Sequence, residues 1–316
     1  MKTSRYYPKL DPNLKRRFLA ACESEAINYE ALWSGNRANL LRGKIGACRE
    51  DVLGKASAHL FILDFCIIWF SSYTEALAVA FLVRRQNSER DDQHNVANLI
   101  SWRICTELVA IRKLILEGLD VPAKQILRSM SENLDALGLA TISAEFCSDF
   151  IEDQDVENAN KTWHKYISKG KARKLIKNNL PVYFAEKLTE HDIYREEEEK
   201  VLSAAAHPSF ISSFVSLFPE YDEVLDSDSI GISNVFSPFS LRTLRYCSYR
   251  LLMHCMYDLS LFSIYEKYIE TADYDQFDDL RHVIKSGRKI CLLSLYLLSE
   301  LDELKKISDS EVIGVL

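Results

Sequence analysis

The stretch Val121–Ile151 constrains the fold of this chain more than any other part of the sequence. Apolar or small side chains recur along it at steps of three and four residues, at Leu127, Met130, Leu134, Leu137 and Thr141. This spacing is typical of an α-helix with one face against a core. Asp120 can cap the first turn, and Pro122 fits there because the first N–H groups of a helix have no partner within it. The sequence therefore predicts one long central helix.

A second stripe of this helix changes character along its length. Arg128, Glu132 and Asp135 lie near its start. Further along it is apolar, at Leu139, Ile142, Phe146 and Phe150. We therefore expect the second half of the helix to be covered on two sides. The simplest interpretation of Arg128 and Glu132 is an ion pair in solvent, which would add at most about 0.5 kcal/mol to stability.

The rest of the chain also favours helices. Only 10 Gly and 7 Pro occur in 316 residues, and we find no alternating apolar and polar run bounded by hairpin turns. We therefore predict an all-α protein, a multi-helix bundle around the central helix. Further helices are expected at Asp11–Trp33, Lys55–Gln86, Val96–Glu117, Val182–His207, Phe239–Thr271 and Asp275–Lys306, with a short or broken helix at Asn36–Gly54.

Four regions follow from this order of elements. They are an N-terminal helical region (1–118), a helical core (119–218), an acidic loop or insertion (219–238), and a C-terminal helical pair that packs on the core (239–316). The segment Pro219–Pro238 is long for a plain connection, and Ser229–Val235 within it could form a short strand.

Composition excludes several classes of protein. A net charge of −7 disfavours a partner of duplex DNA, because proteins that coat DNA are usually basic. The most apolar run contains Asp64 and Glu75, which would each cost about 2.5 kcal/mol or more in a bilayer, so we expect a core helix and no membrane span. The N-terminus lacks the apolar core of a signal peptide, and the eight Cys form no C-x-x-C pair. These features indicate a cytoplasmic protein with reduced cysteines.

Standard motifs for nucleotide binding, hydrolysis and zinc binding are absent from the sequence. A di-iron bundle needs two Glu-x-x-His pairs, and none is present. The nearest group of metal-ligating residues is Glu186, Glu190 and His191, but two carboxylates four residues apart are common by chance. We therefore expect neither a metal nor a cofactor.

The segment Lys161–Lys177 carries seven Lys or Arg residues and no acidic one, with Trp163 and Tyr166 among them. It is the one patch that could meet the phosphates of a substrate, and its candidate substrate-binding residues are Lys169, Lys171, Arg173 and Lys174. Alternatively, these side chains solvate the surface of a helix–turn–helix, or pair with the acidic block Glu196–Glu199.

Two short motifs resemble those of a known family. The sequence LRSMSE (Leu127–Glu132) resembles the R-S-x-x-E helix of one branch of the HEPN-like superfamily, whose members are mostly bacterial all-helical proteins. The residues LS and HPS within Leu202–Ser209 resemble the L-S…H-P-S ending of the same branch. Trp163 and the basic segment lie between the two motifs in the expected order, and the resemblance covers roughly Ala123–Ser216.

The resemblance implies a helical bundle in which Arg128, Glu132 and His207 approach one another. Many members of the wider superfamily are ribonucleases, toxins or parts of phage-defence systems, so it also implies an RNA- or nucleotide-directed effector in stress or phage defence. Their catalytic Arg and His are separated by four to six residues on one helix. This chain departs from that pattern, because Arg250 and His254 have only three residues between them.

The residue types at these positions suit metal-free RNA cleavage. His207 could act as the base or acid, Arg128 could bind the phosphate, and Glu132 could orient either. Pro208 biases His207 away from helical dihedral angles, which places the imidazole at a helix end or a kink. The alternative is a non-catalytic interaction protein, a homodimer, in which the same trio is a structural network. The two differ in whether the trio meets in an open cleft bordered by Lys169–Lys177.

Overall fold

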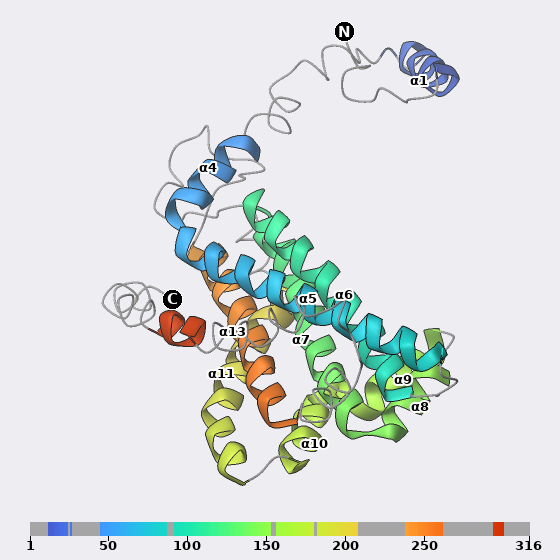
Figure 1. Ribbon diagram of the computed structural model, residues 1–316. Helices are drawn as coiled ribbons and strands as arrows, with labels where there is room; N and C mark the ends of the chain where they lie inside the picture. The colour runs from blue at the N-terminus through green and yellow to red at the C-terminus, as the bar shows by residue number, and fades with distance from the viewer. Residues whose placement is uncertain are drawn as a thin grey trace.

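The computed structural model describes residues 12–24, 26, 45–86, 92–152, 156–179, 182–207, 238–261 and 293–299. Every regular element in these ranges is helical, which confirms the predicted all-α bundle for this part of the chain (Figure 1). The longer helices are α1 (Pro12–Ser24), α4 (Ile45–Lys55), α5 (Ser57–Gln86), α6 (Asp92–Leu116), α7 (Asp120–Ile142), α11 (Val182–Ala206) and α13 (Pro238–Leu261). The shorter ones are α8 (Ala144–Glu152), α9 (Val156–Thr162), the π-helix Trp163–Ile167, the 3₁₀-helix Ser168–Gly170 and α10 (Lys171–Asn179).

Several predictions fall outside the described residues. They are most of the acidic loop 219–238 with its short strand Ser229–Val235, the part of the first helix beyond Ser24, and the end of the helix predicted to reach Thr271. Of the last predicted helix, only 293–299 is described, and it is helical.

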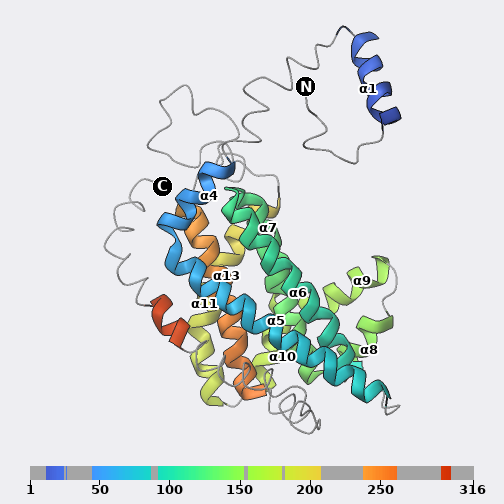
Figure 2. The ribbon, with the colours of Figure 1, turned by 45° about the horizontal axis from the view of Figure 1, so that its top comes forward.

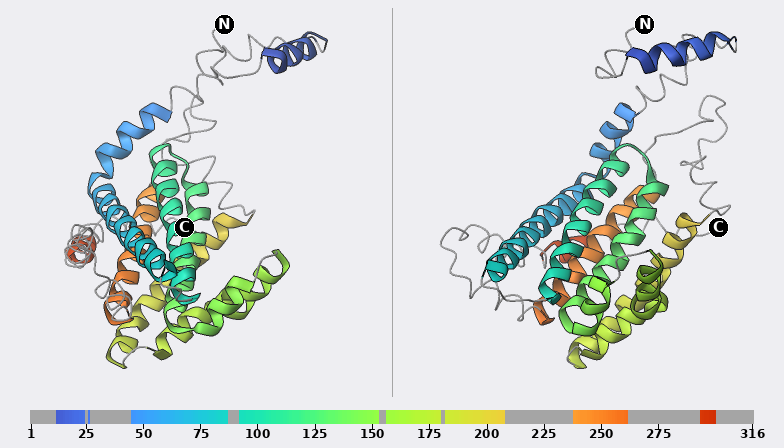
Figure 3. Two further views of the ribbon diagram at one scale, coloured as in Figure 1. Left: turned by 45° about the vertical axis from the view of Figure 1, so that its right-hand side comes forward. Right: turned by 90° about the vertical axis from the view of Figure 1, so that its right-hand side faces the viewer.

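Helix α7 is the centre of the bundle, in contact with α6, α8, α10, α11, α13 and the π-helix. Figure 3 shows α6, α7, α13 and α11 side by side with similar axes. Helix α6 lies antiparallel to α7 after a tight turn in which Gly118 has φ +71°, a conformation that favours glycine. Figure 2 shows α8 and α9 at the end of the bundle opposite α4.

The predicted core face of α7 is confirmed. Each of its members is at most 4% exposed: Leu127, Met130, Leu134, Leu137 and Thr141. On the second stripe, Leu139 and Phe146 are fully buried, so the second half of the segment is covered on two sides as expected. Burying each large apolar side chain contributes roughly 1.5–3 kcal/mol, so this face accounts for much of what holds α7 in place.

The prediction of one helix over Val121–Ile151 is wrong at Ser143. There the backbone is extended (φ −131°, ψ 101°), α7 ends, and α8 begins at the next residue. The Ser143 hydroxyl accepts a hydrogen bond from the N–H of Phe146 (3.1 Å), which is the contact of an N-cap residue. The stripe pattern continues across this break, because both helices pack on the same core.

The predicted cap at Asp120 is also wrong. Asp120 is the first helical residue of α7, and the preceding Leu119 makes no side-chain cap. The Asp120 carboxylate is instead buried, where it accepts hydrogen bonds from Lys124 one turn on and from Thr243 of α13 (2.7 Å). A tertiary partner therefore outcompetes the local cap.

Helix α5 is the most apolar of the described helices. Its segment Ser57–Val79 is long and apolar enough to cross a membrane, but 56% of the most apolar window is buried inside the protein. Burial of that extent is typical of the core helix of a soluble protein. The cysteines at positions 22, 66, 105, 147 and 247 are buried, as expected for core residues.

Candidate functional site

Arg128, Glu132 and His207 come together where α7 lies against the end of α11. The two helices are antiparallel, since Gln125 contacts Ala205, whereas Arg128, later on α7, contacts Ser203, which is earlier on α11. This packing places the RSxxE segment of α7 directly opposite the LS and His of α11. The convergence expected from the resemblance is therefore seen in the geometry, while the roles of the three residues stay predictions.

The guanidinium of Arg128 is the hub of the group. It donates from Nε to Glu132 Oε1 (3.4 Å), and from Nη1 to Ser203 Oγ (3.3 Å) and to His207 Nε2 (3.4 Å). Arginine has no acceptor, so His207 Nε2 accepts in this contact and a neutral ring carries its proton on Nδ1. All of these contacts are long, which is common in sites whose hydrogen bonds tighten only around substrate.

The site is open to solvent. The side chains of Arg128 and Glu132 are 30% and 35% exposed, and His207 is exposed. The expected surface ion pair between Arg128 and Glu132 is present, but it is more than a lone pair on a helix, because each member also binds a side chain from another element.

Glu132 is held from the other side by Trp163, whose indole N–H donates to Oε2 at 3.0 Å. Trp163 begins the π-helix Trp163–Ile167, a wide turn that is rare and often found at functional sites. The chain then turns sharply through Lys169 (φ +57°) and Gly170 (φ +69°). A non-glycine residue at positive φ is strained, so the packing around this turn must stabilise it.

The end of α11 supplies Ser203 and His207, which are four residues apart and therefore on one face. The backbone N–H of His207 bonds to the carbonyl of Ser203 (3.1 Å), and α11 ends at Ala206. This confirms the prediction that His207 lies at a helix end. One hydrogen bond near it, from Gln125 to the carbonyl of Ala205 (3.0 Å), ties this end of α11 to α7.

The four basic candidates of the following segment differ in what they contact. Arg173 pairs with Glu199 (3.0 Å), as the alternative interpretation of this segment expected, and the Lys171 ammonium donates to the carbonyl of His164 (2.6 Å). Lys169 and Lys174 are exposed. Since Glu199 is one turn from Ser203 on α11, the segment borders the site at Arg173. The basic segment 161–177 has the predicted helix–turn–helix form, with the turn at 168–170.

The third member of the polar stripe, Asp135, lies elsewhere. Its side chain, one turn beyond Glu132, is only 13% exposed and accepts hydrogen bonds from Arg195 of α11 (2.7 Å) and Arg250 of α13 (3.0 Å). Burial alone would raise the pKa of Asp135, but the two guanidiniums lower it below its usual value. Arg250 and His254, the pair nearest to the Arg–His spacing of the superfamily, are both buried, and Arg250 is committed to Asp135 and Ser131.

Comparison with protein-family models, curated proteins and solved structures found no match for this chain. Within the described residues, no group of three or more His, Cys, Asp or Glu side chains is arranged to hold a metal ion. His191 contacts the Tyr249 hydroxyl (2.8 Å), while the side chains of Glu186 and Glu190 lie outside the described part.

Two residues of the site were noted in the sequence but not predicted to belong to it. Ser203, in the LS motif, lies four residues before His207 and therefore shares its helix face. Trp163 lies between the two motifs, but its contact with Glu132 could not be predicted, because it depends on a π-helix and on the path of the chain after α9.

Proposed function

We propose that this chain is a cytoplasmic HEPN-like effector in stress or phage defence that cleaves RNA without a metal ion. The observation that supports this proposal is the meeting of Arg128, Glu132 and His207, from two helices, at a surface that solvent reaches. These three groups provide a cation for a phosphate, a carboxylate that orients the cation, and an imidazole that can act as a general base.

In the proposed reaction, His207 Nε2 accepts the proton of a ribose 2′-hydroxyl. The 2′-oxygen then bonds to the adjacent phosphorus, the bond from phosphorus to the 5′-oxygen breaks, and the leaving oxygen takes a proton from water. The products are a 2′,3′-cyclic phosphate and a 5′-hydroxyl. Arg128 leaves its long contact with His207 to bind the phosphate oxygens, where it stabilises the charge that develops.

Glu132 has a positioning role in this scheme. It contacts Arg128 and Trp163, so it fixes the guanidinium and does not itself meet the reacting atoms. The departure from the superfamily spacing of Arg and His is compatible with this scheme, because two antiparallel helices bring the groups together as closely as one helix would.

The test is cleavage of a panel of cellular RNAs by the purified protein in EDTA, beside the His207→Ala and Arg128→Gln variants. We expect cleavage by the native chain, and a loss of about 10²–10⁴-fold in rate for His207→Ala, the usual range for removal of a general base. Both replaced side chains are partly or fully exposed, so the melting temperature should change little.

Gln125→Ala is the matched control, because it removes a hydrogen bond between the same two helices without removing a charged or titrating group. It should retain cleavage. If the native chain does not cut RNA, and His207→Ala lowers the melting temperature sharply, the trio is a structural network and the ribonuclease proposal fails.

A second candidate, an interaction protein that forms a homodimer, is favoured by a different surface. The outer faces of α5 and α6 carry large apolar side chains that are more than half exposed, namely Phe61, Ile68, Leu82, Leu99, Trp102 and Val109. Apolar patches of this kind on a folded protein mark contact surfaces more often than chance. This candidate does not exclude the first, since the α5–α6 face and the trio involve different helices.

A further inference from the structure

A line of five alternating charges crosses the bundle next to the trio. At one end, Arg173 of α10 donates to Glu199 (3.0 Å), which also accepts from Arg195 one turn earlier on α11 (3.1 Å). At the other end, Arg195 donates to Asp135 of α7 (2.7 Å), and Asp135 accepts from Arg250 of α13 (3.0 Å). We call these five residues the charged line.

The charged line is not electrically balanced. It holds three guanidiniums and two carboxylates, a net charge of +1. The nearby His191 and His254 leave this sum unchanged, because burial and the field of the arginines lower their pKa values to about 2 and about 3. An uncompensated charge inside a protein is costly, and proteins normally balance it with a partner of opposite sign.

Two of the arginines also have unused donors. Among the described residues, Arg195 Nε and Arg173 Nη1 are buried and have no hydrogen-bond acceptor. Both belong to the arginines that hold Glu199. Buried donors without acceptors are rare in folded proteins, so two of them on neighbouring guanidiniums indicate an acceptor group that the described side chains do not supply.

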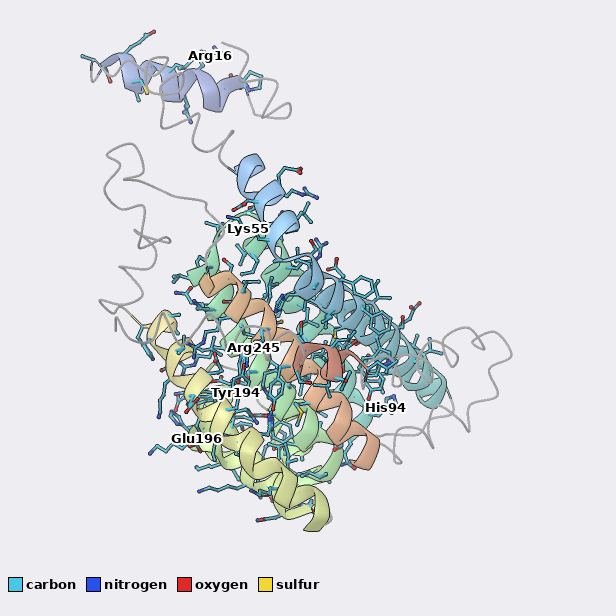
Figure 4. The ribbon with its side chains drawn as sticks, turned by 90° about the vertical axis from the view of Figure 1, so that its left-hand side faces the viewer. Arg16, Lys55, His94, Tyr194, Glu196 and Arg245 are labelled. Atoms are coloured by element: carbon cyan, nitrogen blue, oxygen red, sulfur yellow. The ribbon has the colours of Figure 1, made fainter. Side chains whose placement is uncertain are left out.

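The line reaches solvent at its Glu199 end. The Glu199 side chain is 35% exposed, whereas Arg195 is 3% exposed. On the face between α11 and α13, rings cover the interior: Tyr194 packs edge-on against Tyr249 (4.8 Å), and Arg245 lies over the Tyr194 ring (5.6 Å; Figure 4). A ligand would therefore approach beside Glu199.

We propose that Arg173 and Arg195 form a binding site for a phosphate-class oxyanion, either inorganic phosphate or the phosphate of a nucleotide. Such a group carries the negative charge that balances the line and the acceptors that two guanidinium forks match. Glu199, the partner common to both arginines, turns toward solvent to admit it. The site is one turn of α11 away from Ser203 and does not depend on the ribonuclease proposal.

The test is a titration of the full chain with inorganic phosphate at constant ionic strength, followed by the melting temperature and by calorimetry. We compare the native chain with Arg173→Gln and with Lys200→Gln, which removes the same charge from the exposed face of α11. The native chain and Lys200→Gln should show a saturable rise in melting temperature, about 2 °C at ten times Kd. Arg173→Gln should lose the saturable part and bind phosphate at least tenfold more weakly.

Phosphate also stabilises proteins in general by exclusion from their surface, but that effect does not saturate and is common to all variants. A rise of this kind alone, equal in all three proteins, would overturn the proposal. Adenosine 5′-monophosphate in place of phosphate separates the two sources. Tighter binding that is lost in Arg173→Gln assigns the site to a nucleotide, and affinity equal to that of phosphate assigns it to the free ion.

A second variant keeps the test decisive if Arg173→Gln does not fold. Glu199→Gln removes the carboxylate that competes for both arginines and raises the net charge of the line by one. It should therefore bind phosphate more tightly than the native chain, by about tenfold. A Glu199 that only holds helices together predicts no gain in affinity, so unchanged or weaker binding contradicts the proposal.

Discussion

At the scale of single residues, the interior of this protein keeps a carboxylate ionised and two imidazoles neutral in the field of shared guanidiniums. Asp135 stays charged because two guanidiniums bind it, whereas His191 and His254 stay neutral because they are buried beside the same guanidiniums. A buried pair of this type contributes little net stability, but removal of one partner is strongly destabilising. The charged line therefore fixes how α11 and α13 meet α7 more than it adds to overall stability.

The two histidines predict a specific dependence of stability on pH. An unfolded histidine has a pKa near 6.5, whereas the folded values are about 2 and about 3. Below about pH 6.5 the unfolded chain binds one more proton per histidine, so the free energy of unfolding falls as pH falls. Between about pH 6 and 4 these two groups contribute a slope that approaches about 2.7 kcal/mol per pH unit. Urea denaturation across this range measures it.

The control for this prediction is His191→Phe, which keeps a ring against Tyr249 (5.2 Å between centroids) but cannot titrate. Its slope should be smaller by about 1.4 kcal/mol per pH unit. An identical slope in the two proteins would show that His191 is protonated in the folded state, contrary to its burial.

At the scale of elements, the junction between α7 and α8 decides the direction of the chain toward the site. The N–H of Ser143 still bonds to the carbonyl of Leu139 (2.9 Å), and its hydroxyl already caps α8. The change of direction after α7 leads through α8 and α9 to the π-helix, which carries Trp163 to Glu132. One serine thus serves the end of one helix and the start of the next.

We predict that Ser143→Ala destabilises the protein by about 1 kcal/mol, the usual cost of losing an N-cap hydroxyl. Ser148→Ala, on the exposed face of α8, is the control and should change the free energy of unfolding by less than about 0.5 kcal/mol. Urea denaturation of the three proteins measures both. Equal stability of the two variants would mean that the Ser143 hydroxyl does not stabilise the break between α7 and α8.

At the scale of the whole molecule, two faces differ in chemistry. The end of the α7–α11 pair displays charged and polar groups, whereas the outer face of α5 and α6 displays apolar ones. One bidentate ion pair, between Arg112 and Asp64, joins α5 to α6 beside that apolar face. Large apolar side chains that are exposed on a folded protein are typical of a contact surface.

The homodimer candidate predicts that light scattering after size exclusion finds a dimer for the native chain and a monomer for Ile68→Asp, because a carboxylate in a buried interface has no partner. Ile193→Asp is the matched control, since Ile193 is similarly exposed but lies on α11. It should remain a dimer. A native chain that is monomeric at high concentration would contradict this candidate.

The sequence by itself determined which segments are helical and much of where they end. Apolar spacing marks the core face of α7. Gly118 marks the end of a helix, between α6 and α7. It also determined that Arg128 and Glu132 share a face, because a four-residue step is local geometry. These features depend on neighbours along the chain, which a single sequence displays directly.

Only the tertiary structure decided which polar groups meet. Asp120 caps no helix because Thr243, more than a hundred residues away, is a better partner. At Ser143 the helix ends, although the apolar spacing continues beyond it. Asp135 and Glu132 lie on the same stripe of the helix, yet Asp135 binds two buried arginines whereas Glu132 reaches solvent. The energy of a polar group depends on whether water or a fixed partner surrounds it, and that is set by the packing of α7 against α11 and α13.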